Sequence, residues 1–421
     1  MLDIKFIREN PQVVQNAAKN KGVDVDINYL LEIDSKYREL SLAVQKLREE
    51  RNALTSGIKG KPASEQIEKG KVLKERLEKE EHALNSVQEE LNEWLLKIPN
   101  IPADDVPIGK DETGNKEIRK IGGIPRFSFK AKSHDELALS LDLYDTKHAT
   151  KIAGTRGYFL KNELVLLEQG VLQLALEFMI KQGFTPMTVP WIVNKDALWG
   201  TGYFPWGIED HYTTQDGQGL IGTSEVSLTA YHQGEVLNEK DLPIKLVGIS
   251  PCFRREVGSY GKDTKGFIRV HQFNKVEQVV LSVADEQNSR EWHEKMLEYS
   301  EKILQDLKLP YRVMLMCTGD MGAGQRKKYD IETWFPSQNK YRETHSASYF
   351  NDFQARRLNI RYRTKNGNTK YVYTLNNTVI ATPRILAAIL ENYQEIDGSV
   401  IIPKVLRKYF NNFDKISPKK Q

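Results

Sequence analysis

Two stretches of heptad-spaced apolar residues, separated by a short segment that contains glycine and proline, dominate the N-terminal part of this 421-residue chain. The first stretch, with one polar interruption, runs through Leu30, Ile33, Tyr37, Leu40, Val44, Leu47, Arg51, Leu54 and Ile58. The second runs through Leu73, Leu77, Glu80, Leu84, Val87, Leu91, Trp94 and Ile98. Because this spacing places one stripe of side chains along a helix, two such stripes around one turn predict an antiparallel helical hairpin.

The predicted hairpin is long and basic at its tip. Each helix has about 30 residues and hence a length of about 45 Å, which is long for a helix inside a compact domain, so the hairpin is expected to protrude. Lysines outnumber carboxylates around the turn, namely Lys59, Lys61, Lys69, Lys71 and Lys74 against Glu65 and Glu68. Two interpretations stay open at this point: a coiled coil for dimerisation, or an arm whose tip contacts a polyanion.

Whole-chain composition narrows the class of protein. The 61 basic and 57 acidic residues leave a net charge of only +4, so any nucleic-acid surface must be local. The N-terminus lacks the apolar region of a secretion signal, and no run of about 18 apolar residues would span a membrane. We therefore expect a cytoplasmic enzyme. Two cysteines, Cys252 and Cys317, are too few for a thiolate zinc site, and no zinc is expected.

Prolines and turn residues mark the end of the hairpin and predict a linker over residues 100–115. It would separate an N-terminal domain, residues 1–99 with its arm at about 30–98, from a second domain at 116–421. In the second domain, helical stretches alternate with short β-branched or aromatic runs that are not regularly separated by helices. That order favours an α+β fold, with a mainly antiparallel sheet flanked by helices.

One predicted strand, in the stretch "GFIRVHQFNKVEQVV", carries unusual chemistry. An alternation of two residues places Phe267, Arg269, His271, Phe273, Lys275 and Glu277 on one face. With Arg254 and Glu256 on the preceding strand, this face could hold a phosphate and a flat base. Neither a P-loop nor a dinucleotide fingerprint is present. Taken alone, the intervening glycine loop at 257–266 is an ordinary flexible connection.

A second anion-binding signal lies in "TLNNTVIATPRILAAILENYQ", which predicts a strand, a turn at Pro383 and an amphipathic helix headed by Arg384. The helix dipole does not favour a cation at this end. The placement suggests that Arg384 serves a bound anion.

Together these segments resemble the three signature motifs of class II aminoacyl-tRNA synthetases: "FRRE" with "GFIRVHQFNKVE", "ATPRILAAILENYQ", and Pro190 in "GFTPMTVPWIV". The hairpin, "IPNIPADDVPIG", "GTSE" and "DFQARR" narrow the resemblance to the seryl-tRNA synthetase family, bacterial type. The resemblance implies ATP-dependent joining of L-serine to tRNA(Ser) through seryl-adenylate. It also implies that residues 1–99 bind tRNA and that residues 171–193 form a homodimer interface.

The resemblance assigns ATP contacts residue by residue. Arg254 would bind the α-phosphate and the reacting carboxylate, Glu256 the adenine amino group, and Val270 would contact ATP through its backbone. Phe273 and Arg384 would lie on opposite faces of adenine, with Arg384 also on the γ-phosphate. The further ATP-binding positions are Arg255, Glu343, Thr344, His345 and Ser346, of which Glu343 and Ser346 would hold Mg²⁺. His345 is not expected to act as a general base, because the attacking carboxylate is already anionic.

For serine, the resemblance implies that Thr223 and Glu225 hold the ammonium group, with Ser224 as a further serine-binding residue and Arg254 on the carboxylate. Glu277 and Thr378 would hold the hydroxyl. Lys262 and Lys265 in the glycine loop would follow the acceptor end of tRNA.

Two departures affect these assignments. Many bacterial members have "NGSGLAVGR" and "REISS" where this chain has "NNTVIATPR" and "RETHS". Two other classes also remain: an amino-acid-activating paralogue that loads a carrier protein, which should lack the arm, and a noncatalytic RNA-binding relative, which should have lost Arg254, Glu277, Glu343 or Arg384.

Overall fold

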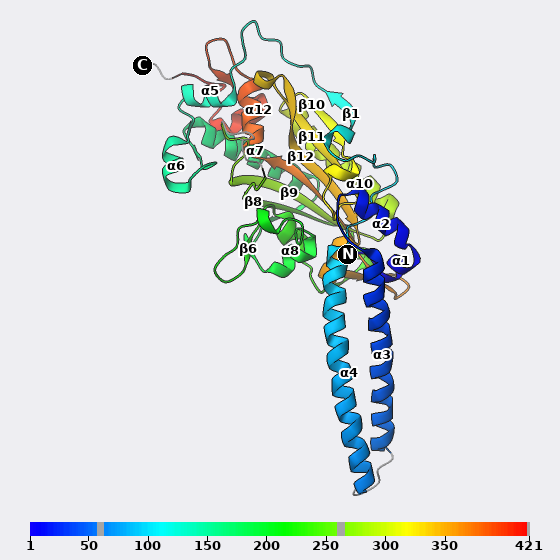
Figure 1. Ribbon diagram of the computed structural model, residues 1–421. Helices are drawn as coiled ribbons and strands as arrows, with labels where there is room; N and C mark the ends of the chain where they lie inside the picture. Colours follow the sequence, from blue (N-terminus) through cyan, green and yellow to red (C-terminus); the bar gives the residue numbers. More distant parts are fainter. Residues whose placement is uncertain (57–62, 259–265, 419–421) are drawn as a thin grey trace. The chain divides into compact units, whose positions relative to one another are not determined.

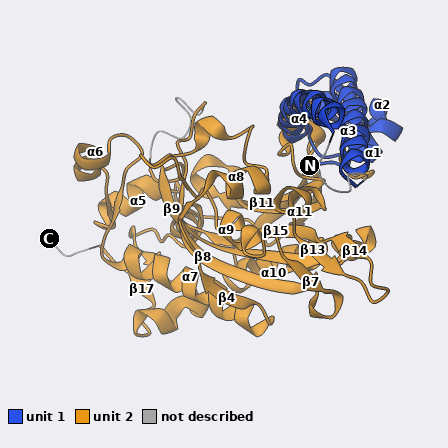
Figure 2. Cartoon of the chain, turned by 90° about the horizontal axis from the view of Figure 1, so that it is seen from below, with its two compact units in different colours: residues 1–101 blue, residues 102–421 orange. Residues whose placement is uncertain are grey.

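A computed structural model describes residues 1–56, 63–258 and 266–418. The chain divides into two compact units, Met1–Ile101 and Pro102–Gln421, which are coloured separately in Figure 2. Each unit has apolar clusters of its own.

Over residues 1–56 and 63–101 the first unit consists of four helices, and its two long helices confirm the predicted hairpin. The helices are α1 (Ile4–Glu9), α2 (Pro11–Asn20), α3 (Ile27–Ser56) and α4 (Ser64–Lys97). Figure 1 shows α3 and α4 side by side along their length. The heptad stripes form two apolar clusters: one joins α1 and α2 to the base of the hairpin, and the other consists of Val44, Leu47 and Leu77 with Leu73 and Leu84.

A buried carboxylate ties α1 to the base of the hairpin. Asp34 on α3 is only 1% exposed. Arg8 on α1 donates two hydrogen bonds to it, from Nε to Oδ2 (2.7 Å) and from Nη2 to Oδ1 (2.8 Å). Arg38 adds a third contact at 3.2 Å. A buried charge requires such partners, so Arg8 fixes α1 against α3.

The second unit is built on an eight-stranded sheet in the order β1-β10-β11-β12-β15-β9-β8-β4. All neighbouring pairs are antiparallel except β4 with β8. This confirms the α+β expectation. The strands are β1 (Lys116–Ile121), β4 (Thr185–Thr188), β8 (Ile244–Phe253), β9 (Gln272–Ser282), β10 (Tyr311–Leu315), β11 (Lys327–Phe335), β12 (Lys340–Asn351) and β15 (Tyr373–Ala381).

Alternating residues of the central strands separate the two faces of the sheet. On β9, Val276 and Val280 belong to the larger apolar cluster, to which the long helices α7 (Glu163–Lys181), α10 (Glu286–Asp306) and α12 (Arg384–Asn392) contribute. Val279 and Leu281 face the other way, into a smaller cluster. Its helical residues come from α8 (Lys195–Thr201), α9 (Glu225–Ala230) and α11 (Phe353–Leu358). The start of β9 on that second face is left for a pocket.

The remaining elements are short. Two helices are α5 (His134–Ser140) and α6 (Lys147–Ala153). The minor strands are β2 (Tyr144–Asp145), β3 (Phe159–Leu160), β5 (Ile192–Val193), β6 (Gly219–Leu220), β7 (Val236–Asn238), β13 (Arg361–Arg363), β14 (Thr369–Tyr371), β16 (Val400–Ile401) and β17 (Lys415–Ile416). Among the described residues, no helix combines the length and apolar character needed to cross a membrane.

Two sequence-based expectations differ from the structure. The strand predicted from residue 267 begins only at Gln272. Phe267 is fully buried beside the rings of His134 and Tyr144, so the prediction that it shares a face with Phe273 was wrong. The two-residue alternation was extended too far back, through a turn. In addition, most of the segment 100–115 belongs to the second unit, where Ala103 N donates to a backbone oxygen 2.8 Å away.

Candidate active site

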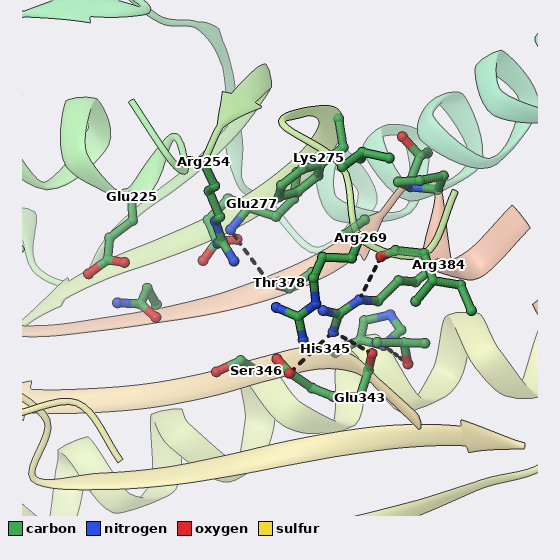
Figure 3. Close-up of a pocket in the computed structure, with 18 of the residues that line it drawn as sticks. Glu225, Arg254, Arg269, Lys275, Glu277, Glu343, His345, Ser346, Thr378 and Arg384 are labelled. Carbon is green, nitrogen blue, oxygen red and sulfur yellow. Dashed lines mark hydrogen bonds and ion pairs between the residues drawn. The ribbon is translucent and has the colours of Figure 1, made fainter. Parts of the chain in front are cut away.

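A polar pocket of about 260 Å³ opens on the second face of the sheet, at the start of β9. Side chains from β9, β12, β15 and the start of α12 converge on it (Figure 3). Five cations, Arg254, Arg269, Lys275, Lys328 and Arg384, line it together with four carboxylates, Glu225, Glu256, Glu277 and Glu343.

Glu225, the first residue of α9, is a buried carboxylate at one end of the pocket. Tyr203 Oη donates to its Oε2 (2.9 Å) and Gln354 Nε2 donates to its Oε1 (2.9 Å). Gln354 is in turn held by a hydrogen bond of 2.6 Å from Thr374 Oγ1. Burial, together with the nearby Glu277 carboxylate, raises the pKa of Glu225 to about 7. Such a group is suited to bind a cation.

Glu277 lies on β9 directly opposite Thr378 of β15. Its Oε2 accepts a hydrogen bond from Thr378 Oγ1 (3.2 Å) and lies 2.5 Å from Lys275 Nζ. Glu277 is 2% exposed and Lys275 is 5% exposed. Both partners contact the same oxygen, which leaves Oε1 of Glu277 available to accept a hydrogen bond from a ligand.

A forked cation just after β8 and an aromatic ring on β9 lie together. The guanidinium carbon of Arg254 is 5.2 Å from the centre of the Phe273 ring, a cation–π distance. Arg254 Nε also donates to the Gly222 carbonyl at 3.3 Å. A flat ring beside a guanidinium is suited to a planar, phosphorylated ligand.

Glu256 lies just beyond the end of β8 and faces Arg269. It has a φ of +56°, which is uncommon outside glycine. Arg269 Nη1 donates to its Oε2 at 2.6 Å, and both residues line the pocket. This ion pair orients a carboxylate at the pocket wall.

Arg384, the first residue of α12, contacts the opposite wall. Its Nη1 donates to the backbone oxygen of Glu343 (2.8 Å) and lies 3.2 Å from Oε2 of the same residue. Its Nε donates to the Ile268 carbonyl at 3.3 Å. Burial opposes the charge of Glu343, but the positive charges of Arg384, Lys328 and Arg254 outweigh it and lower the pKa of Glu343. The carboxylate is therefore ionised at neutral pH.

Hard oxygen donors gather beside this pair. Glu343 and Ser346 line the pocket, and Asp330 of β11 is paired in register with Ser346. Lys328 Nζ donates to Asp330 Oδ2 at 2.9 Å. Mg²⁺ is usually held by one or two carboxylates plus the phosphates of a substrate. This donor set fits that pattern, although no three His, Cys, Asp or Glu side chains cluster as a metal site in the described part of the chain.

His345 is unsuited to proton transfer at neutral pH. It is 1% exposed, and its Nδ1 lies 2.9 Å from Thr344 Oγ1. Burial lowers its pKa to about 4. The ring is therefore neutral.

Comparison with known proteins decides the family. Residues 1–102 match the family model "Seryl-tRNA synthetase N-terminal domain", and residues 210–393 match "tRNA synthetase class II core domain (G, H, P, S and T)". The chain is 45% identical over 413 residues to the serine–tRNA ligase of Deinococcus radiodurans, an alignment that covers 97% of each chain. The chain belongs to the seryl-tRNA synthetase family.

Solved structures agree with this assignment. The synthetase resembles seryl-tRNA synthetase from Pyrococcus horikoshii, complexed with ATP, with a TM-score of 0.93 and 41% identity over the whole of both chains. It also resembles the cytoplasmic serine–tRNA ligase from Naegleria fowleri, in complex with AMP, with a TM-score of 0.89 and 31% identity; that match covers 100% of this chain and 99% of the other.

Most of the site residues predicted from the sequence of this synthetase line the pocket. They are Glu225, Arg254, Glu256, Val270, Phe273, Glu277, Glu343, Thr344, His345, Ser346, Thr378 and Arg384. Three others do not line it. Arg255 is exposed and donates to the Glu209 carbonyl (3.0 Å), whereas Thr223 and Ser224 are buried behind Glu225.

The predicted tRNA-binding lysines fall into two groups. Lys69, Lys71 and Lys74 are exposed on α4 of the first unit. Lys59, Lys61, Lys262 and Lys265 lie outside the described residues.

Sequence reasoning missed several pocket residues of the synthetase. Lys275 was placed on the correct face but given no role. Tyr203 and Lys328 come from segments without a motif of their own. Gln354 lies in "DFQARR", which was given no role in the site; it does not line the pocket, and only the folded chain brings it and Tyr203 to Glu225. Arg269 was likewise placed on the charged face without a role, because its bond to Glu256 depends on the turn before β9.

Proposed function

We propose that this synthetase joins L-serine to tRNA(Ser) in two steps that consume ATP. The carboxylate of serine attacks the α-phosphorus of ATP in line, which forms seryl-adenylate and releases pyrophosphate. A ribose hydroxyl at the 3′ end of tRNA then attacks the acyl carbon and releases AMP. The observation that carries the proposal is a single pocket that holds forked cations beside an aromatic ring and, at its other end, two separately bonded buried carboxylates.

ATP fits the cationic part of the pocket. Arg254 would contact the α-phosphate, and Arg384 the γ-phosphate, so that charge developing on the phosphates is neutralised. Phe273 and Arg384 would lie on the two faces of adenine, and Glu256, already oriented by Arg269, would accept a hydrogen bond from its amino group. The ATP and AMP named with the two solved relatives support this assignment.

Serine fits the other end. Glu225 would bind the ammonium group, with Thr223 and Ser224 shaping the wall behind it. Glu277 would accept the serine hydroxyl on Oε1, since Lys275 and Thr378 share Oε2. Alanine would leave this buried carboxylate oxygen without a partner, which disfavours it.

Glu343 and Ser346 would hold Mg²⁺. When bound, the ion would neutralise charge on the phosphates of ATP. The ionised state of Glu343 and the hydroxyl of Ser346 suit this role. No proton acceptor is required, which agrees with the neutral, buried His345.

The first unit would bind tRNA. An exposed helical hairpin with Lys69, Lys71 and Lys74 near its tip suits phosphate contacts and recognition of shape more than reading of bases. We further propose a homodimer that assembles through residues 171–193, as the family resemblance implies, and that acts in the cytoplasm.

The test is amino-acid-dependent exchange of ATP with pyrophosphate, followed by charging of tRNA(Ser). Serine alone should drive exchange, and exchange driven equally by alanine or glycine would overturn the serine assignment. Exchange without charging would favour a paralogue that loads a carrier protein. RNA binding without exchange would favour a noncatalytic relative.

Deleting residues 26–99 separates the roles of the two units. Charging should be lost while exchange persists, because each unit has its own apolar clusters. Loss of both activities would mean that the catalytic unit needs the arm in order to fold.

A further inference from the structure

We propose that Glu168 is a positioning residue of the ATP site: through Thr382 and Asn274 it holds Phe273 and Arg384 at a fixed separation. Glu168 lies on α7, does not line the pocket, and has no role in the function proposed above. The inference rests on that function, in which Phe273 and Arg384 lie on the two faces of adenine.

Glu168, Thr382 and the half-buried Asn274 form a node of hydrogen bonds. Glu168 is 8% exposed and Thr382 is 1% exposed. Thr382 Oγ1 donates to Glu168 Oε1 at 2.7 Å, and Asn274 Nδ2 donates to the same oxygen at 3.2 Å. One carboxylate oxygen therefore receives a bond from each of two segments that are over 100 residues apart in sequence.

Backbone groups of Thr382 and Asn274 also take part in this node. Thr382 N donates to the Asn274 carbonyl (2.8 Å), and Asn274 N donates to Thr382 Oγ1 (3.1 Å). This pair extends the β9–β15 ladder by one step beyond its last paired residues, Lys275 and Ala381. At this point β15 has ended, at Ala381, whereas β9 continues to Gln272 beside β8.

A side-chain hydroxyl has only one proton, so it donates its hydrogen bond to the best acceptor within reach. A carboxylate is a stronger acceptor than a neutral carbonyl. With Glu168 present, the Thr382 proton is directed to α7 and its lone pairs receive Asn274 N. Without Glu168, the Thr382 hydroxyl can donate to the Asn274 carbonyl, 3.1 Å away. The segment around Thr382 then has no side-chain hydrogen bond to Glu168 of α7.

The node is close in sequence to two residues of the proposed ATP site. Asn274 directly follows Phe273, and Thr382 precedes Arg384 by two residues. Arg384 also bonds the backbone of Glu343 and Ile268 on the pocket wall. The node therefore ties the segment carrying the ring and the segment carrying the guanidinium to one rigid helix. A shift of about 1 Å at such contacts is enough to weaken binding or reaction substantially.

The test compares two pairs of variants in serine-dependent exchange of ATP with pyrophosphate. Thr382→Val removes the hydroxyl at nearly constant volume, and Thr382→Ser keeps it; Glu168→Ala removes the acceptor, and Glu168→Gln keeps an oxygen. We expect the KM for ATP to rise about tenfold in Thr382→Val and Glu168→Ala, as the loss of one well-placed hydrogen bond would predict. The KM for serine should stay within about twofold, and the two conservative variants should restore the KM for ATP.

Melting temperature is measured on all four variants, because a purely structural role would lower it without separating the two substrates. An unchanged KM for ATP in Thr382→Val, or an equal rise in both KM values, would overturn the positioning role. Thr382→Val keeps this test available if Glu168→Ala fails to fold. Failure of the proposed function is distinguishable, since the unaltered synthetase would then show no serine-dependent exchange.

Discussion

Lys275 Nζ lies 2.5 Å from Glu277 Oε2, although both side chains are almost entirely buried. Replacing Glu277 with Ala removes the acceptor that we propose for the serine hydroxyl and leaves the buried Lys275 without its partner. Serine dependence should collapse, with the KM for serine rising about 100-fold or more and the KM for ATP changing little. Steady-state exchange kinetics check this.

Glu332→Ala serves as the control for that substitution. Glu332 is also a strand carboxylate with an ion pair, to Arg312 Nε at 2.6 Å, but it does not line the pocket. Its replacement should leave both KM values near those of the unaltered protein. An unchanged serine affinity in Glu277→Ala would contradict the hydroxyl-binding role.

The raised pKa of Glu225 predicts a pH-dependent affinity for serine. With a pKa of about 7, the carboxylate is mainly protonated at pH 6 and mainly ionised at pH 8. Only the ionised form attracts the ammonium group, so the KM for serine should fall about tenfold from pH 6 to pH 8. Glu225→Gln should abolish the slope and raise the KM at pH 8. A slope that survives in this variant would assign the titration to another group.

The lysines of α4 predict a salt-sensitive contact with tRNA. Replacing Lys69, Lys71 and Lys74 with Gln should weaken tRNA(Ser) binding about tenfold or more at 0.1 M salt and make its salt dependence shallower. Exchange activity should not change. Replacing three exposed lysines of the second unit, Lys295, Lys302 and Lys308, provides a charge-matched control. Equal weakening by the control set would argue against a contact specific to the arm.

The bond from Arg8 to Asp34 predicts a local stability effect. Arg8→Met leaves the buried Asp34 with only Arg38, at 3.2 Å, and should destabilise the docking of α1 by about 3 kcal/mol. Hydrogen exchange of amides in residues 4–20 should accelerate by about 100-fold. The control is Arg48→Met, which breaks an exposed pair with Glu81 (2.7 Å) and should cost less than about 1 kcal/mol. Comparable acceleration in both variants would show that burial of the carboxylate is unimportant.

The elements that the sequence predicted well are those with a strong local repeat. The hairpin followed from heptads over about 60 residues, and the strand, turn and helix around Pro383 followed from the proline and the amphipathic run after it. The start of β9 was misjudged because five residues of apparent alternation, from Phe267, belong to a turn. In so short a run, alternation of residue types does not distinguish a strand from a turn, and here the turn buries the consecutive residues Phe267 and Ile268.

The residues of the site can likewise be separated into those that the sequence predicted and those that it did not. Arg254, Glu277 and Arg384 lie in motifs, so the resemblance located them. Tyr203 lies in no motif, and Gln354 lies in "DFQARR" but was given no role in the site; both bond Glu225 only because tertiary packing brings them to it. No spacing rule connects such residues, because their distance in sequence is set by the loops between them.

The two apolar clusters of the hairpin share no buried residue, so packing near the tip does not depend on packing at the base. Stability along the hairpin is then close to a sum of neighbouring layers. Adding seven residues to each helix at matching positions would lengthen the arm by about 10 Å and keep the seam in register. The hairpin is thus an adjustable spacer: evolution or design could change its reach in whole heptads without altering the catalytic sheet.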